Sequence, residues 1–406
     1  MGPPARTLAY VEERARMLME RYAVEEIRIP LLERIELYQR STGETSDIVS
    51  KQMYTFTDRD EAETTLALRP EGTPGVVRAY IEAGLDRSDP EQRFFYSGPM
   101  FRRERPQKGR YRQFSQFGVE VFGRADPACD AELLVMIDDL RRDLGLAFQF
   151  EINSLGDAKC RPAFRTALLD YGRAHFAELC YDCHERLERN PLRLLDCKID
   201  VKLAEAAPKS LDYLCPECRQ HFDTVIDLLN AAGVTFQINP RIVRGLDYYM
   251  RTTFEITSTN LGSQNAVLAG GRYDGLVEVL GGAPVPGIGF AIGMERLALA
   301  LQAAEKPRAG LPRVALIALG EAAARRAAEL ARELRALPLQ VELLSPERSL
   351  KSQLKRADRL GANYAVIIGQ DELARSAAQL RDLKASAQRE VSLANLADEL
   401  LPALRD

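Results

Sequence analysis

The sequence predicts a mixed α/β (α+β) protein, in which an antiparallel, β-rich body carries a helical insertion and is followed by a separate α/β domain. Three patterns predict this fold. Strand-like alternation occurs on both sides of a mostly helical stretch at residues 161–232. A linker-like segment, QAAEKPRAGLPR, covers residues 302–313. Beyond it, strand and helix patterns alternate as βαβαβ, which is typical of a compact α/β domain.

The N-terminal part of the body predicts a helix, a strand and a hairpin. Residues 8–22 place apolar side chains at helical spacing and predict an amphipathic helix. Residues 25–34, EEIRIPLLER, predict a strand interrupted at Pro30. Residues 53–73 predict a hairpin followed by a helix, with Thr73 as the N-cap and Pro74 at the first helical position.

The rest of the body alternates between the two kinds of pattern. Two strands flank a charged loop in the stretch 98–123, and a helix is expected at 127–147. Further strands are predicted at 148–156, 235–243, 248–258 and 265–273, and residues 287–301 read as a strand that enters a helix. We therefore expect a body of residues 1–308, with its helical insertion at about 158–232.

The C-terminal segment predicts a domain of its own at residues 309–406. Its expected strands are 314–319, 339–344 and 363–369, and its expected helices are 321–336, 349–361 and 393–404. A chain of 406 residues is long enough for two such domains, each with its own core.

Composition is that of a globular, cytoplasmic protein. Hydrophobic residues make up 46% and charged residues 28%, and no apolar run approaches the ~18 residues that span a bilayer. The opening residues lack the apolar core of a signal peptide, so we expect no export and no membrane partner. The net charge of -4 does not exclude a nucleic-acid partner, because local basic patches decide phosphate binding.

The densest basic patch is the stretch GPMFRRERPQKGRYRQFSQFGVEVFG at residues 98–123. If residues 111–122 form a strand, one of its faces carries Arg112, Phe114, Gln116, Gly118 and Glu120. The preceding strand would add a matching face, which is made of Phe94, Tyr96, Gly98, Met100 and Arg102. Arginine forks match phosphate oxygens, and a phenylalanine ring offers a stacking face. The pattern favours a nucleotide beside a small polar molecule, although a solvated, charged sheet face would show it too.

Other motifs narrow the chemistry. Glu71 in LRPEGTPG could bind an ammonium group or simply favour a helix N-terminus, and Arg296 could reach a phosphate or lie on a helix surface. The sequence contains no G-x-x-x-x-G-K-[ST] loop, no G-x-G-x-x-G spacing and no G-x-S-x-G elbow. Its three histidines, His175, His184 and His221, all fall in the insertion. Chemistry by arginine positioning and charge stabilisation remains, as phosphoryl and nucleotidyl transfer require.

Together these motifs resemble the bacterial histidyl-tRNA synthetases, a family of class II aminoacyl-tRNA synthetases. The resemblance runs over nearly the whole chain, through EEIRIPLLERIELYQRSTGETSDIV (motif 1), LRPEGT, FRRERPQKGRYRQFSQFGVEVFG (motif 2), RGLDYY, AGGRYDGL and GFAIGMERL (motif 3). RGLDYY and AGGRYDGL are its most specific part. The last ~95 residues resemble a class IIa anticodon-binding domain, in which the basic helix RSLKSQLKR suits backbone phosphates, although a solvated charged face is its alternative.

The resemblance implies a function, namely ATP-dependent activation of L-histidine to histidyl-adenylate, helped by Mg²⁺, and transfer to the 3' end of tRNA(His). It also implies a homodimer built on motif 1. Arg102 would contact the α-phosphate, Phe114 would stack on adenine, Arg112 would share this environment and Arg296 would hold the far phosphates. Arg244 would be the catalytic arginine, together with Arg102.

The same resemblance implies a histidine pocket. Glu71, Thr73 and Gln116 would hold the α-amino end of the substrate. A neutral imidazole has one donor and one acceptor, so a selective pocket needs a partner for each. Glu120 and Tyr249 would supply these partners. Tyr248, Tyr273 and Arg244 complete the expected set.

Seven cysteines argue for reduced thiols or a metal site. Cys180-x-x-Cys183 and Cys215-x-x-Cys218 have the ligand count and pair spacing of one structural zinc site, with surface thiols as the alternative. Cys129, Cys160 and Cys197 are expected to pack as small apolar residues.

Two non-catalytic alternatives stand beside the synthetase. The regulatory subunit of ATP phosphoribosyltransferase keeps the class II body and senses histidine, but it typically lacks an anticodon-binding domain and has eroded ATP and arginine motifs. A tRNA-binding sensor module would explain the C-terminal domain but not a complete active site. In this sequence the anticodon-binding domain and the ATP and arginine motifs are both intact, which favours the enzyme.

Overall fold

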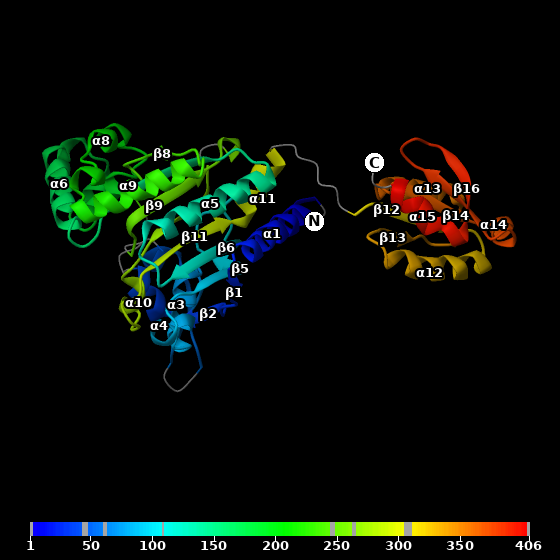
Figure 1. The fold of residues 1–406 in the computed structure, drawn as a ribbon, viewed down its shortest axis with the longest axis horizontal. Helices are drawn as coiled ribbons and strands as arrows, with labels where there is room; N and C mark the ends of the chain where they lie inside the picture. The colour runs from blue at the N-terminus through cyan, green and yellow to red at the C-terminus, as the bar shows by residue number, and fades with distance from the viewer. Residues whose placement is uncertain are drawn as a thin grey trace. The chain divides into compact units, whose positions relative to one another are not determined.

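The structure is a computed structural model that describes residues 3–42, 48–59, 63–107, 109–243, 248–261, 265–303 and 311–403. The chain divides into two compact units, Met1–Lys306 and Pro307–Asp406. Figure 1 shows the helices and strands of each unit. No helix in the described ranges combines the length and the apolar character that a membrane crossing requires.

The first unit is built on an eight-stranded sheet in the order β1-β5-β6-β11-β10-β9-β7-β8. Its strands are β1 (Glu25–Glu26), β5 (Arg93–Phe101), β6 (Gln113–Phe122), β7 (Gln149–Ser154), β8 (Gln237–Ile238), β9 (Met250–Thr257), β10 (Ala266–Arg272) and β11 (Gly287–Gly293). The six central strands pair antiparallel, as predicted, and the edge pairs β1–β5 and β7–β8 are parallel. The strand predicted at 235–243 is limited to two residues, because the segment turns at Pro240 and Arg241.

Four helices cover one face of this sheet (Figure 1). They are α1 (Pro3–Arg21), α5 (Pro127–Leu144), α9 (Pro216–Ala231) and α11 (Met294–Ala303). Side chains alternate between the two faces of β6. Phe117, Val119 and Val121 point toward the four helices and are almost completely buried in the core between sheet and helices. The opposite face carries the side chains that line the candidate site.

A smaller group of elements packs on part of that opposite face. It contains α3 (Thr73–Glu82), α4 (Leu85–Ser88) and α10 (Leu276–Val279). The prediction that Thr73 is the N-cap of α3 is wrong by one residue, because Gly72 is the N-cap and Thr73 is the first helical residue. Its hydroxyl bonds Glu120 instead of capping the helix.

Motif 1, residues 25–49, contributes one strand, β2, to a small three-stranded antiparallel sheet. The sheet consists of β2 (Leu32–Arg34), β4 (Thr65–Leu68) and β3 (Tyr54–Thr57), in that order, with α2 (Ile35–Thr42) and the π-helix η1 (Ile48–Gln52) alongside. The predicted hairpin is therefore confirmed as β3–β4. The predicted break at Pro30 is also confirmed, because β1 and β2 lie on either side of it.

The insertion is helical, as expected. It consists of α6 (Arg161–Ala174), η2 (Phe176–Glu178), α7 (Tyr181–Leu187), η3 (Pro191–Leu194), α8 (Val201–Ala206), η4 (Ser210–Tyr213) and α9. Helix α9 reaches the main core, where it packs on α5, and Leu211 of η4 packs against the same core. The other helices form two small apolar clusters of their own.

The second unit is a five-stranded sheet in the order β13-β12-β14-β15-β16. Its elements are β12 (Arg313–Ala318), α12 (Glu321–Arg335), β13 (Gln340–Leu343), α13 (Leu350–Arg359), β14 (Tyr364–Ile368), α14 (Gln370–Ala374), β15 (Ala377–Asp382), β16 (Gln388–Ser392), η6 (Leu393–Asn395) and α15 (Leu396–Ala403). The predicted βαβαβ core is confirmed by the parallel pairs of β12 with β13 and β14. The antiparallel hairpin β15–β16 was not predicted, although a short turn at residues 383–387 separates its two strands.

Candidate active site

The uncovered part of the sheet face holds a cavity of about 280 Å³. Seven of the predicted site residues line it, and they come from four separate segments of the chain: Glu71, Thr73, Arg102, Phe114, Gln116, Tyr249 and Arg296. Convergence of these residues on one cavity is a result of the tertiary fold, since Glu71 and Arg296 lie 225 positions apart in the sequence.

The floor of the cavity comes from the pairing of β5 with β6. Opposite residues in this register are Met100 and Phe114, Gly98 and Gln116, Tyr96 and Gly118, and Phe94 and Glu120. The two predicted rows therefore share one face. Gly118 is required there, because a Cβ at this position would overlap the ring of Tyr96.

Two arginines define one end of the cavity. The Cζ atom of Arg102 lies 5.3 Å from the centroid of the Phe114 ring, and its Nε donates to the Pro70 carbonyl at 2.9 Å. Arg296 Nε donates to the Gly109 carbonyl at 3.0 Å, and its Nη1 donates to Ala266 at 2.7 Å. These bonds fix the planes of both guanidinium groups, which suits them to phosphate oxygens.

The electrostatics at this end favour an anion. Burial lowers the pKa of Arg296, and the nearby positive charges of Arg110 and Arg102 lower it further, against an opposing contribution from Glu104. Such crowding of positive charge is relieved when an anion binds. Arg110 also lines the cavity and was not singled out from the sequence, where only its place in motif 2 marks it.

Carboxylates line the same cavity, at Glu104, Glu255 and Glu295. Glu295 accepts the backbone N–H of Ser115 at 2.8 and 3.0 Å. Carboxylate oxygens are the ligands that Mg²⁺ prefers beside substrate phosphates, so the residues present fit a magnesium–nucleotide pair. Glu104 lies in motif 2 and Glu295 in motif 3, but neither was singled out from the sequence, and Glu255 lies in none of the quoted motifs.

The other end of the cavity is lined by hydrogen-bonding groups. Tyr248 donates to Glu71 Oε2 at 3.1 Å, and the rings of Tyr248 and Tyr249 lie 4.6 Å apart. Gln116 is 9% exposed, and its side-chain Oε1 has no hydrogen-bond partner among the described residues. A buried carbonyl oxygen of this kind favours a ligand that brings a donor.

Glu120 lies beneath this end and is 1% exposed. Its Oε1 accepts the Thr73 hydroxyl at 2.6 Å, and its Oε2 accepts the hydroxyl of Tyr273. Burial raises the pKa of Glu120 to about 8, which the two hydroxyl donors oppose. A Cβ at Gly289 on the neighbouring strand would overlap the carboxyl group, so glycine leaves the space that Glu120 fills.

Two predicted residues stand apart from this arrangement. Arg112 is exposed, precedes β6 and does not line the cavity, although its carbonyl accepts the N–H of Arg102 at 2.9 Å. Arg244 lies outside the described residues.

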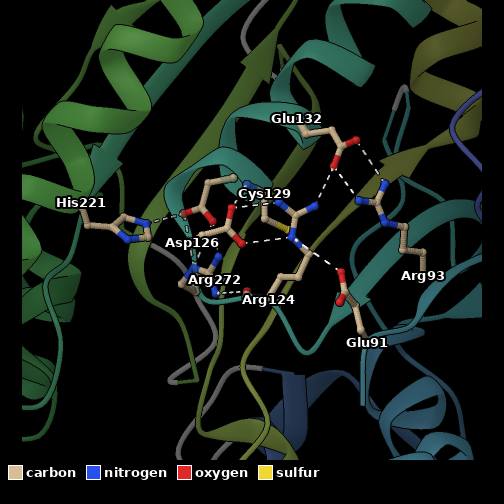
Figure 2. A network of polar contacts seen from close by, with 9 residues as sticks. Glu91, Arg93, Arg124, Asp126, Cys129, Glu132, His221 and Arg272 are labelled. Atoms are coloured by element: carbon tan, nitrogen blue, oxygen red, sulfur yellow. Dashed lines mark hydrogen bonds and ion pairs between the residues drawn. The ribbon is translucent and has the colours of Figure 1, made fainter. Parts of the chain in front are cut away.

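Arg272 of the AGGRYDGL motif is a structural anchor that sequence reasoning missed. Its guanidinium is fully buried and pairs with Asp130 at the start of α5 and with Asp274. His221 of α9 places its Nε2 2.9 Å from Asp130 Oδ2, and Arg124 extends the network to Asp126 and Glu132 (Figure 2). The network therefore fastens the last helix of the insertion to the sheet.

The single zinc site predicted from Cys180, Cys183, Cys215 and Cys218 is wrong in its grouping. Cys180 and Cys183 lie with Cys197 and Asp200, whereas Cys215 and Cys218 lie with Asp157 and Cys160. Cys160 and Cys197 are therefore part of these groups and not merely small apolar packing residues, as was expected. The sequence shows the C-x-x-C pairs, but only the fold decides which other residues meet them.

An antiparallel sheet with helices on one face, an arginine-lined cavity on the other and a separate α/β unit is the architecture of a class II aminoacyl-tRNA synthetase. Comparison with known families is specific. A histidyl-tRNA synthetase family profile matches residues 2–297, and an anticodon binding domain profile matches residues 313–402. The chain therefore belongs to the histidyl-tRNA synthetase family.

Curated relatives and solved structures agree with this assignment. The chain is 48% identical to a histidine–tRNA ligase of Anaeromyxobacter dehalogenans, over 95% of this chain and 94% of the relative. It is 49% identical to one of Geobacter sulfurreducens, over 95% and 93%. The apo histidyl-tRNA synthetase of S. aureus superposes with a TM-score of 0.80 at 33% identity, covering 98% of this chain and 96% of that one.

A structure described as an ATP phosphoribosyltransferase regulatory subunit/histidyl-tRNA synthetase from Bacillus halodurans also superposes. Its TM-score is 0.64 at 20% identity, over 90% of this chain and 94% of that one. At this identity the likeness concerns the fold alone.

Proposed function

We propose that this chain is a histidine–tRNA ligase. It activates L-histidine with ATP to histidyl-adenylate and transfers histidine to the 3' end of tRNA(His), releasing pyrophosphate and AMP. The observation that carries the proposal is that arginines suited to phosphates and polar groups suited to an amino acid line one cavity, in a chain of the histidyl-tRNA synthetase family.

In the first step, a carboxylate oxygen of histidine attacks the α-phosphorus of ATP. The new O–P bond forms as the bond to the β-phosphate oxygen breaks, and pyrophosphate carries that electron pair away. Arg102 contacts the α-phosphate, Phe114 stacks on adenine and Arg296 holds the far phosphates. Arg244 is the catalytic arginine that neutralises charge at the α-phosphate, as the family resemblance implies.

Mg²⁺ supplies charge neutralisation on the phosphates, and Glu104, Glu255 and Glu295 are the cavity carboxylates that could hold it. Arg112, exposed beside the cavity, is assigned to the outer phosphate and adenine environment. The guanidinium of Arg102 lies over the Phe114 ring, which supports a shared role for the two side chains in seating the nucleotide.

Histidine occupies the other end of the cavity. Its α-amino group is held by Glu71, Thr73 and Gln116, where the Gln116 oxygen offers an acceptor. Its imidazole is recognised by hydrogen bonds to Glu120 and Tyr249. The Tyr248 hydroxyl holds Glu71 in place, and the Tyr273 hydroxyl holds Glu120 in place. A site that hydrogen-bonds both imidazole nitrogens rejects side chains that leave these buried groups unpaired.

The two units have different functions. Residues 1–308 form the catalytic domain with the insertion at about 158–232, and residues 309–406 form the anticodon-binding domain. Lys351, Lys355 and Arg356 are exposed on α13, which supports a phosphate-binding role for this helix. We assign the protein to the cytoplasm as part of this proposal, because tRNA is charged there.

The active form is a homodimer that pairs through motif 1. Large apolar side chains are exposed on and beside the three-stranded sheet to which motif 1 contributes β2, namely Leu31 at 43%, Leu32 at 44% and Phe56 at 44%. Burial of such a patch favours association. Sedimentation velocity of the full chain should give twice the monomer mass, and a Leu32→Asp variant should sediment as a monomer.

The test of the activity is histidine-dependent ATP–pyrophosphate exchange, with the Arg244→Ala variant in parallel. Exchange with histidine alone among the amino acids, lost in the variant, is the expected result. Histidine binding without exchange in the unaltered chain would instead support the non-catalytic regulator.

A further inference from the structure

The insertion contains two separate clusters of metal-ligating side chains. We call Asp157, Cys160, Cys215 and Cys218 the α6–α9 group, and Cys180, Cys183, Cys197 and Asp200 the α7–α8 group. Within each group, the four ligand atoms lie within 4.8 Å of one another.

Both groups are built from two ligand pairs with the same spacing. The pairs are Asp157-x-x-Cys160 with Cys215-x-x-Cys218, and Cys180-x-x-Cys183 with Cys197-x-x-Asp200. In every pair, one member is the N-cap residue of a helix, and the other lies three residues before or after it. The turn at a helix start directs both members to one point, as in structural zinc sites built on C-x-x-C pairs.

The separations fit one tetrahedral ion per group. Ligands bound ~2.3 Å from a tetrahedral zinc lie ~3.8 Å from each other. The sulfur atoms of Cys180 and Cys197 are 3.7 Å apart. An iron–sulfur cluster places its cysteines on different iron atoms and would need wider spacing between the sulfurs.

Backbone N–H groups surround the ligand atoms as they do in zinc sites. Cys215 N–H points to the Cys160 sulfur at 3.0 Å, and Asp200 N–H points to the Cys197 sulfur at 3.4 Å. The aspartates are held in the same way, by the N–H of Lys159 at 2.9 Å and that of Cys180 at 3.0 Å. Such hydrogen bonds to metal-binding side chains orient the ligands and favour thiolates over thiols.

The insertion also needs a stabilising element beyond its apolar contacts. Its two clusters contain four buried residues each: Phe164, Leu168, Leu195 and Ala207 in one, and Leu179, Cys183, Leu187 and Leu194 in the other. Cores of this size rarely stabilise a fold alone, and metal ions are a common supplement.

From this geometry we propose that the insertion binds two structural zinc ions, one in each group, through three cysteine thiolates and one aspartate. On binding, the three thiols of a group release their protons to solvent and their sulfurs bond the ion. No electrons are transferred.

The two ions have different mechanical roles. The α6–α9 group joins the segment after β7 to the start of α9, and so closes the base of the insertion. Asp157 pairs with Arg251 of β9 at 3.6 Å, and Arg161 donates to the carbonyl of Tyr249 at 2.5 Å, so this ion stiffens the segment behind the cavity. The α7–α8 group closes the distal part of the insertion.

The test is metal stoichiometry of the full chain, purified from zinc-supplemented cells and measured by inductively coupled plasma mass spectrometry. We expect two zinc ions per chain. Cys197→Ser and Cys160→Ser should each retain one ion, the double variant none, and the matched control Cys129→Ser, which changes a buried cysteine outside both groups, should retain two. A zinc-free or one-zinc unaltered chain would overturn the proposal.

A second measurement needs no variant and covers the case in which a serine variant fails to fold. Cobalt reconstitution of the unaltered chain should give the visible absorption of tetrahedral cobalt with sulfur-to-metal charge transfer, saturating at two equivalents. Saturation at one equivalent, or octahedral cobalt spectra without charge transfer, would contradict two Cys₃Asp sites. Neither readout depends on aminoacylation, so the result is independent of the proposed activity.

Discussion

Thr73 donates a hydrogen bond of 2.6 Å to Glu120 and so joins the first turn of α3 to the middle of β6 beneath the cavity. Both partners are buried, and Tyr273 donates to the other carboxyl oxygen. This contact puts a carboxyl group where water does not reach, and its protonation therefore affects both stability and ligand recognition.

Stability of the ligand-free chain should fall as pH rises from about 5 to about 8. Burial raises the pKa of Glu120 from 4.5 to about 8, so the folded state retains a proton that the unfolded chain has already lost. The free energy of unfolding then decreases by about 1.4 kcal/mol per pH unit from this group. Urea unfolding of Glu120→Gln should show a flatter pH dependence, whereas the exposed Glu20→Gln should keep the slope of the unaltered chain.

Replacement of Arg296 should weaken ATP use. Its planar guanidinium group is fixed by hydrogen bonds to the carbonyls of Gly109 and Ala266, and a lysine ammonium group cannot reproduce that geometry. We expect Arg296→Lys to raise KM for ATP by about 10-fold or more in pyrophosphate exchange, with a smaller change in KM for histidine. Arg28→Ala, whose side chain is 84% exposed, serves as the control. An unchanged KM for ATP would remove Arg296 from the phosphate site.

Gly118→Ala should damage the floor of the cavity. The added methyl group would overlap the ring of Tyr96, which is 2% exposed and has no room to move without displacing its neighbours. We expect a loss of about 1–3 kcal/mol in stability and a raised KM for histidine. Gly275→Ala is the matched control, because a Cβ there meets nothing within 4 Å. Equal behaviour of the two variants in thermal melts and histidine titrations would refute the role of Gly118.

Asp130→Asn should be among the most destabilising single changes in the first unit. It weakens the partner of the fully buried Arg272 and disturbs the contact with His221. Loss of a partner in a buried ion pair costs about 3–5 kcal/mol, measured by urea unfolding. In contrast, Glu321→Gln breaks an exposed pair with Arg325 and should cost less than about 1 kcal/mol.

Charge reversal on α13 should separate the two steps of the reaction. Lys351→Glu combined with Lys355→Glu places repulsive charge on the exposed face of that helix. We expect tRNA charging to fall by about 10-fold or more, with a shallower salt dependence, while pyrophosphate exchange without tRNA is unchanged. Arg325→Glu on α12 is the control. Loss of both activities together would indicate misfolding instead of a tRNA contact.

Periodicity and motif spacing accounted for most of the elements in this chain. Three features were predicted from local patterns: the alternation in β5 and β6, the helical insertion and the βαβαβ start of the second unit. Such patterns depend only on residues close together in the sequence, so they can be recognised without the tertiary structure. The two-residue strand β8 and the hairpin β15–β16 were misjudged, because edge and short strands are defined by their partners as much as by their own residues.

The sequence by itself determined the family, the main elements and the residue types of the candidate site. The reason is that an arginine binds phosphate, a phenylalanine stacks and a glycine leaves space because of its own side chain, and the spacing of these residues can be found in the sequence. The tertiary structure alone decided which distant residues meet. It placed Glu104 and Glu255 in one cavity with Arg296, buried Arg272 against Asp130, and divided six of the seven cysteines between two groups with one aspartate in each. The physical reason is that coordination, ion pairing and cavity lining depend on distances of a few ångströms between segments far apart in the chain, and no local pattern encodes those distances.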